Sequence, residues 1–205
     1  MSIQTGLQLY SVRRSLSANW QETLEKCAEM GYRRVQLTTE DGYAHTAGNA
    51  SSETLRACFD RLGIHLASLH VKASETTQWD RMIAFAQTLD CDVLIVPMGL
   101  YTCPADIERM ANRMNRWMDI CDKAGMRLYY HNHVQEFRVM DDGKTLLQHL
   151  LSRMDPRIKL ELDAYWAVRG GTDPAAWIRE LGSRCDIVHL KDLPRAVQPV
   201  NVFDI

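Results

Sequence analysis

The chain has 205 residues, of which 46% are hydrophobic and 24% charged, and its formal net charge is −2. This composition is ordinary for one globular domain, here taken as residues 1–205. The near-neutral charge gives no electrostatic case for a nucleic-acid partner, which usually needs a basic face. Apolar runs stay well short of the roughly 18 residues of a membrane helix, and the first residues lack a signal-peptide pattern. We therefore expect no membrane partner. None of the six cysteines forms a CxxC pair, so we expect reduced thiols and a cytoplasmic location.

Short apolar runs alternate with amphipathic segments along the whole sequence. Strands are predicted at 7–12, 32–37, 64–70, 92–97, 127–131, 158–163 and 186–191. Helices are predicted near 20–28, 55–62, 79–89, 107–121 and 144–154, with another opening at Asp173-Pro174. Seven alternating units indicate a parallel sheet covered by helices, a pattern that a closed barrel and an open doubly wound sheet share. The first strand is not followed by GxGxxG, which disfavours a dinucleotide-binding sheet.

Ionisable side chains cluster where the predicted strands end. The residues are His70, His131, His133, Glu136, Asp163, His189 and Lys191. The carboxyl ends of parallel strands meet at one edge of a sheet, so these side chains should share one rim. Such a gathering of ionisable groups is tolerated only when the groups are paired or bound to a metal. Converging carboxylates and imidazoles suit one divalent ion, which could be Mn, Zn, Co or Mg.

Several of these residues have a simpler structural interpretation. Asp163 could cap a following turn, Glu136 could lie on a solvated loop, and Lys191 could form an exposed ion pair with Asp192. Glu161 lies two residues before Asp163 and therefore shares its strand face, which makes it a candidate partner behind the ligands.

The residues just beyond the sixth predicted strand leave two interpretations open. Trp166 could stack on a sugar ring or simply pack. Gly170 and Gly171 could let the backbone approach a ligand or could turn the chain.

Four segments carry a resemblance to a known family. They are Gly6 to Ser11, Tyr130 to His133 with Glu136-Phe137, Leu160 to Asp163 with Trp166-Ala167, and Val188 to Asp192. Together they resemble the sugar phosphate isomerase/epimerase group, whose xylose-isomerase-like barrel is also used by AP-site endonucleases. The resemblance runs from about residue 6 to 192. It implies a parallel (β/α) TIM barrel with one divalent metal held by four ligands from strands five to eight, typically Glu, Asp, His and Glu.

Carried over position by position, this resemblance assigns Asp163 and His189 as metal ligands. At strand five the usual Glu position is occupied by His131, with Glu136 a few residues on. Either residue could ligate, and we take Glu136 as the third ligand. The strand-eight Glu has no counterpart, because only fourteen residues follow Lys191 and none is a glutamate. We therefore expect about seven βα units with a truncated or atypical eighth.

The end of the sequence bears on that eighth unit. The last residues could form a short eighth strand, in which Asp204 is the only carboxylate beyond Asp192. A homo-oligomer could cover the barrel edge that remains open.

The resemblance implies a metal-dependent isomerase or epimerase that acts on a small sugar, sugar derivative or polyol by enediolate-type proton transfer. The expected catalytic residues are Glu136, His131, His133 and Lys191, and the expected substrate-binding residues are Gln8, His70, Trp166 and Arg169. Alternatives are a keto-polyol dehydratase and an inactive or sugar-binding truncated barrel. AP-site cleavage is disfavoured by the charge. All enzymatic interpretations require Asp163 and His189 to lie within ~6 Å of each other, so that one ion can bind both.

Overall fold

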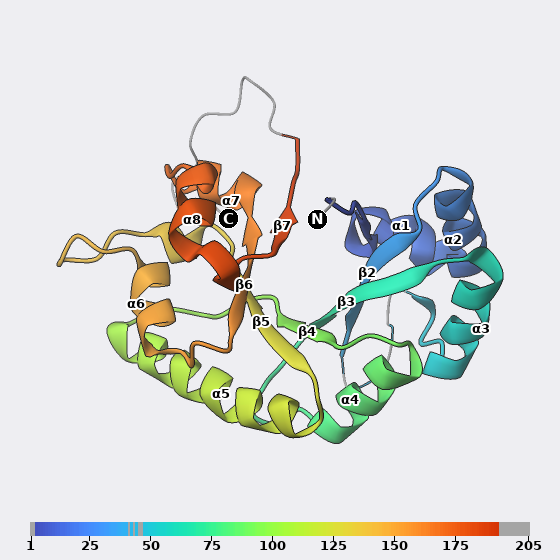
Figure 1. Ribbon diagram of the computed structural model, residues 1–205, viewed down its shortest axis with the longest axis horizontal. Helices are drawn as coiled ribbons and strands as arrows, with labels where there is room; N and C mark the ends of the chain where they lie inside the picture. The colour runs from blue at the N-terminus through green and yellow to red at the C-terminus, as the bar shows by residue number, and fades with distance from the viewer. Residues whose placement is uncertain (1–2, 41, 43, 45–46, 193–205) are drawn as a thin grey trace. The chain divides into compact units, whose positions relative to one another are not determined.

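The computed structural model describes residues 3–40, 42, 44 and 47–192 (Figure 1). The chain divides into two compact units, Met1–Val96 with Lys123–Met126 and Pro97–Asp122 with Arg127–Ile205. The expected eighth strand and Asp204 lie outside the described residues. Within the described part of the chain, no helix combines the length and the apolar character that a membrane span requires.

The described residues of the first unit form four strands, each parallel to the next along the chain (Figure 1). They are β1 (Leu7–Gln8), β2 (Arg34–Thr39), β3 (His65–Val71) and β4 (Val93–Val96). Its helices are α1 (Arg13–Ala18), α2 (Trp20–Glu29), α3 (Ser52–Leu62) and α4 (Trp79–Thr88). Helix α3 packs against both α2 and α4. All four residues of β4 are buried, as expected for a strand covered on both faces.

The first predicted strand, 7–12, is wrong for most of its length. Strand β1 ends at Gln8, and Leu9–Val12 forms a short 3-10 helix that leads into α1. The Gln8 side chain accepts a hydrogen bond from the Tyr10 backbone N–H at 2.9 Å. This local bond offers the backbone an alternative to the sheet, so the chain turns although its residues are apolar enough for a strand.

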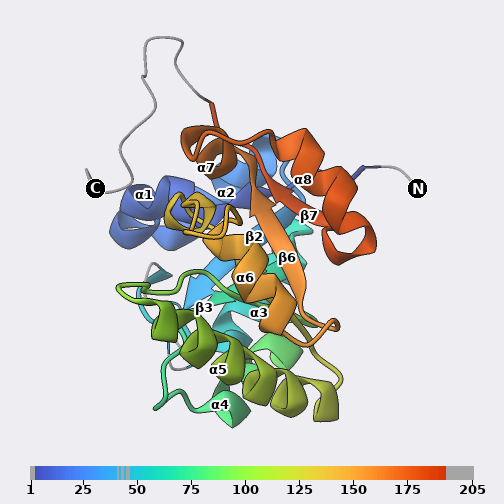
Figure 2. The ribbon, with the colours of Figure 1, turned by 90° about the vertical axis from the view of Figure 1, so that its left-hand side faces the viewer.

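Up to residue 192, the second unit contains three parallel strands, β5 (Arg127–His131), β6 (Lys159–Asp163) and β7 (Ile187–His189). Its helices are α5 (Pro104–Lys123), α6 (Leu146–Arg153), α7 (Ala164–Arg169) and α8 (Pro174–Leu181), with 3-10 turns at Gln135–Phe137 and Gly182–Arg184. Helices α5 and α6 lie side by side in both views (Figures 1 and 2), where Asn115 Nδ2 donates to the Arg153 carbonyl at 3.0 Å. Pro174 opens α8, as the sequence predicts.

Helix α7 is absent from the sequence-based expectation. It begins directly after β6 because the Asp163 side chain caps it, accepting from the Trp166 backbone N–H at 3.1 Å. The strand therefore passes into a helix within one residue. This holds Trp166 one turn beyond the end of the strand.

The two glycines after α7 serve packing and turning. A Cβ added at Gly170 would lie 2.5 Å from the Cβ of Phe137, whereas Gly171 has φ +76° and open space around it. We expect Gly170→Ala to lower the free energy of unfolding by about 1–3 kcal/mol, because the backbone must shift away from Phe137. Gly171→Ala isolates the backbone cost of a left-handed residue, about 1 kcal/mol. Urea denaturation measures both, and a smaller loss in Gly170→Ala than in Gly171→Ala would contradict the packing explanation.

Candidate functional site

The candidate site lies at the carboxyl ends of the three strands of the second unit. His131, Asp163 and His189 are the last residues of β5, β6 and β7. The register pairs His131 with Glu161 and Asp163 with His189. Because residues paired across parallel strands point to the same face, these four side chains meet.

Three ligand atoms converge there. Asp163 Oδ2 lies 3.8 Å from His131 Nε2 and 3.8 Å from His189 Nδ1. All three atoms lie within 4.8 Å of one another, with His131 and Asp163 buried and His189 half-buried. One ion with bonds of ~2.1 Å can reach atoms at these separations. The distance between Asp163 and His189 therefore satisfies the condition that the enzymatic interpretations require.

Glu161 holds both histidines from behind. Its Oε2 lies 2.9 Å from His131 Nδ1, and its Oε1 lies 3.2 Å from His189 Nε2. Its side chain is fully buried. Each imidazole therefore uses one nitrogen on Glu161 and turns the other toward Asp163. A carboxylate behind a histidine in this way fixes its tautomer and orients it toward a metal. The two-residue spacing from Asp163 made Glu161 a candidate partner behind the ligands in the sequence, although it was not among the predicted catalytic, substrate-binding or metal residues.

Glu136 is turned into its own loop. The Tyr130 hydroxyl donates to Glu136 Oε1, and the His133 backbone N–H donates to Oε2 at 2.9 Å. The hydroxyls of Tyr130 and Tyr101 are 2.8 Å apart, which extends this buried chain. Among the described residues, no group that could hold an ion includes Glu136, and the group drawn wholly from the second unit takes His131 from β5. The physical reason is that β5 ends at His131, and the 3-10 turn that follows carries Glu136 back over Tyr130.

Burial gives Glu136 a pH-dependent effect on stability. Burial of the carboxyl group raises the pKa of Glu136 from 4.5 to about 7, although the hydrogen bonds from Tyr130 and His133 act to lower it. A pKa that is higher in the folded state means that stability is lost as pH rises through about 7. Between about pH 5 and about pH 8, wild type should lose roughly 2–3 kcal/mol that Glu136→Gln retains. Urea denaturation of both proteins at the two pH values tests this, and parallel pH profiles would contradict it.

Lys191 pairs with Asp163 and not with its sequence neighbour Asp192. Its Nζ lies 2.6 Å from Asp163 Oδ2. The same ammonium lies 5.2 Å from the centre of the Trp166 ring and 5.7 Å from that of Tyr165. The two oxygens of Asp163 thus have different partners, since Oδ1 caps α7 and Oδ2 faces Lys191 and the histidines.

Aromatic and polar groups of α7 stand beside these residues. The Trp166 ring lies 5.7 Å from the ring of His133, which in turn is 5.0 Å from that of His131. Arg169 Nη1 donates to the Tyr165 hydroxyl at 3.0 Å. Within the described part of the chain, the buried indole Nε1 of Trp166 has no hydrogen-bond partner. An aromatic ring with a free donor can bind an amphipathic ring such as a sugar.

Two expected substrate-binding residues, Gln8 and His70, belong to the first unit. Gln8 Nε2 donates to Gln36 Oε1, and Gln36 Nε2 donates to Ser68 Oγ at 2.7 Å, which links β1, β2 and β3. His70 lies near the end of β3 and is 6% exposed.

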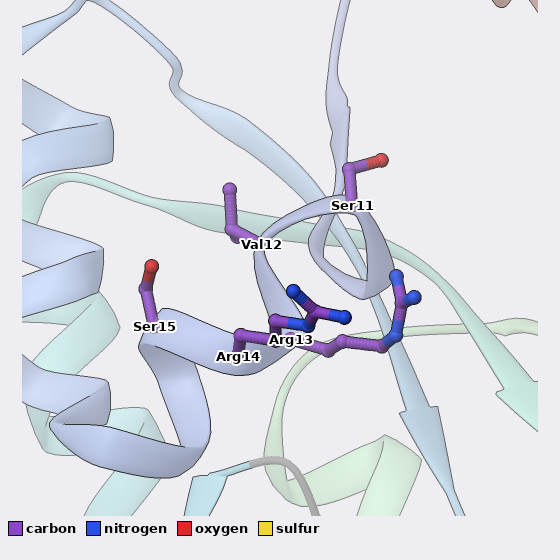
Figure 3. Close-up of a pocket in the computed structure, with 5 residues that line it drawn as sticks. All are labelled: Ser11, Val12, Arg13, Arg14 and Ser15. Atoms are coloured by element: carbon purple, nitrogen blue, oxygen red, sulfur yellow. The ribbon is translucent and has the colours of Figure 1, made fainter.

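The first unit also has a hollow at the start of α1, shown in Figure 3. It is lined by Ser11, Val12, Arg13, Arg14 and Ser15, none of which was predicted for the site. Arg13 Nη1 donates to the Tyr10 carbonyl at 3.0 Å, and its guanidinium lies over the Tyr10 ring. Part of the charge at this hollow is therefore already engaged by its own chain.

Comparisons with known proteins fit this arrangement of strands and polar groups. Residues 24–201 match the family described as xylose isomerase-like TIM barrel. An inosose dehydratase from Geobacillus kaustophilus (strain HTA426) is 26% identical, over 84% of this chain and 61% of that protein. The chain thus spans less than two thirds of this curated relative.

Two solved structures show the same fold. A sugar phosphate isomerase/epimerase from Parabacteroides distasonis ATCC 8503 is 25% identical, with a TM-score of 0.79 over 94% of this chain and 77% of that one. A probable 3-DHS dehydratase from Bacillus anthracis is 15% identical, with a TM-score of 0.70 over 93% of this chain and 73% of that one.

Proposed function

Because the chain belongs to the xylose isomerase-like TIM barrel family, we propose that it is a divalent-metal-dependent isomerase or epimerase of a small sugar, sugar derivative or polyol. The observation that carries this proposal is the convergence of Asp163 Oδ2, His131 Nε2 and His189 Nδ1 in front of Glu161. One carboxylate and two imidazoles whose tautomers are fixed from behind suit a divalent cation. When bound, such an ion supplies Lewis-acid polarisation of a carbonyl oxygen.

His133 is the residue that we assign to proton transfer. It is half-buried, lies beside His131 and Trp166, and is outside the group that could hold the ion. An imidazole titrates near neutral pH, so it can take a proton from one carbon and return it to a neighbouring position. Glu136 holds the His133 backbone and would orient this loop.

Trp166 and Arg169 are assigned to substrate binding. The Trp166 ring would stack on the substrate, and its buried Nε1–H would donate to a hydroxyl. Arg169 already contacts the hydroxyl of Tyr165, the residue before Trp166, and would bring a positive charge to this part of the site.

Incubation of the full chain with Mn²⁺ and a panel of ketoses in D₂O tests this proposal. We expect Mn²⁺-dependent deuterium incorporation next to the carbonyl, together with an isomeric or epimeric product. His133→Asn should lower kcat by about 10²–10⁴-fold with Mn²⁺ affinity unchanged. His65→Asn, an exposed histidine at the start of β3, is the matched control. Metal-independent exchange, or an unaffected His133→Asn variant, would contradict the proposed roles.

Dehydration of a keto-polyol is the second candidate, favoured by the similarity to an inosose dehydratase. It needs the same proton abstraction beside a carbonyl, followed by loss of a hydroxyl from the next carbon as water. Mass spectrometry of the product distinguishes the two reactions, because isomerisation and epimerisation conserve the elemental composition and dehydration removes one water.

A further inference from the structure

Lys191 and the candidate ion compete for one oxygen. Asp163 Oδ1 is engaged by the Trp166 backbone N–H, so Oδ2 is the oxygen that faces the two histidines. Lys191 Nζ lies 2.6 Å from that same Oδ2. The Asp163 side chain is fully buried, whereas that of Lys191 is 43% exposed. The buried carboxylate is therefore fixed, and the lysine is the partner that has room to move.

We propose that Lys191 sets the affinity of the ion site, with its ammonium occupying Asp163 Oδ2 until a divalent cation displaces or repels it. This inference rests on the ion site of the proposed function. An ion ~2.1 Å from Oδ2 would lie within ~4.7 Å of an ammonium in the observed position. Two positive charges at that separation repel strongly, because the separation is well inside the Debye length and the ion would lie on a buried carboxylate.

Two aromatic rings already lie close to the Lys191 ammonium in the position where it contacts Asp163. Lys191 Nζ lies 5.2 Å from the ring centre of Trp166 and 5.7 Å from that of Tyr165. Ring faces attract an ammonium at such distances, so the lysine can leave Asp163 without returning fully to water. Displacement by the ion would then place the positive charge over the ring that we assign to substrate stacking.

Titration with Mn²⁺ tests the proposal without reference to activity, because EPR measures the free aqueous ion directly. Lys191→Met removes the charge and keeps the length of the side chain, while Lys191→Arg keeps the charge. We expect Lys191→Met to bind Mn²⁺ at least about tenfold more tightly than wild type, equivalent to about 1.4 kcal/mol. The affinity of Lys191→Arg for Mn²⁺ should stay within about threefold of wild type, equivalent to about 0.6 kcal/mol, because this variant retains the positive charge. Lys123→Met, at the exposed end of α5, is the matched control and should equal wild type.

Three outcomes would overturn the proposal. Equal or weaker binding by Lys191→Met would refute the role of Lys191 and leave the ion site standing. Equally tighter binding by Lys191→Arg would refute it as well, because that variant retains the positive charge. Absence of Mn²⁺ binding in every protein, including Lys191→Met with an intact circular dichroism spectrum, would remove the ion site and the proposed function together.

Discussion

Replacing Asp163 with Asn should lower the affinity for Mn²⁺ by at least about 100-fold and leave the free energy of unfolding within about 1 kcal/mol of wild type. The structure gives each oxygen of Asp163 a separate partner. Oδ1 caps α7 by accepting from Trp166 N–H, and Oδ2 faces His131 and His189. Asn caps a helix about as well as Asp, so the substitution removes the charge from Oδ2 and keeps the cap.

Asp163→Ala complements Asp163→Asn, because it tests the helix cap together with the metal ligand. It removes the helix cap as well as the ligand, so it should lose a further 0.5–2 kcal/mol or so of stability relative to Asp163→Asn. Mn²⁺ affinity should fall to a similar extent in both variants. EPR titration and urea denaturation of the same preparations measure the two quantities. A variant Asp163→Asn that binds Mn²⁺ as tightly as wild type would show that Asp163 is not a ligand.

The same pair of variants bears on the proposed reaction. Because Asp163 is required for the ion, deuterium exchange into a ketose should disappear in Asp163→Asn even though the fold is intact. Exchange that persists in Asp163→Asn but is lost in His133→Asn would place the chemistry on the histidine without a cation. That result would contradict the metal-dependent mechanism and leave the proton-transfer role of His133 in place.

The end of the sixth strand at Asp163 could be predicted from sequence, whereas β7 ends at His189, two residues before the predicted end. Strand runs 158–163 and 186–191 were recognisable by their apolar pattern, and parallel pairing brings the last residues of neighbouring strands together. In the structure Asp163 pairs in register with His189. Glu161 follows from the same rule, since residues two apart share a face, but its contact with both histidines depends on side-chain rotamers that spacing does not specify.

The residues that follow strand five could not be placed in the same way. His131 and Glu136 both lie near the end of that strand, and the choice between them depends on the local path of the chain. That path is a 3-10 turn stabilised by hydrogen bonds to Glu136 from Tyr130 and from the His133 backbone. Local hydrogen bonds of this kind can redirect the chain after a strand, and hydrophobic periodicity does not detect them.

The partner of Lys191 shows the same limit in an ion pair. Sequence proximity suggests Asp192, whereas the structure joins Lys191 to Asp163. The buried carboxylate gains more from a nearby ammonium than an exposed one does, so tertiary structure decides the pairing.

Glu161→Gln should weaken Mn²⁺ binding by about 10–100-fold, although Glu161 is not one of the three residues that we assign as ligands of the candidate ion. The carboxylate oxygens lie 2.9 Å from His131 Nδ1 and 3.2 Å from His189 Nε2, and protons on these two nitrogens would leave a lone pair on His131 Nε2 and on His189 Nδ1. A glutamine offers one acceptor and one donor. Its N–H₂ group must donate to one of the two histidines, and that ring then carries its proton on the nitrogen facing Asp163. A protonated nitrogen cannot ligate a metal, so one of the three ligands is lost.

A control variant distinguishes the effect of Glu161 on the histidine tautomers from a simple loss of charge or of the fold. Glu180→Gln, an exposed residue of α8, removes the same charge elsewhere in the same unit and should bind Mn²⁺ as wild type does. The side chain of Glu161→Gln has nearly the same shape, and removing a buried charge need not destabilise the fold. Urea denaturation should therefore show little loss while EPR shows weakened binding. Wild-type affinity in Glu161→Gln would mean that the histidines hold their ligating tautomers without Glu161. The candidate site would then reduce to the three residues at the strand ends.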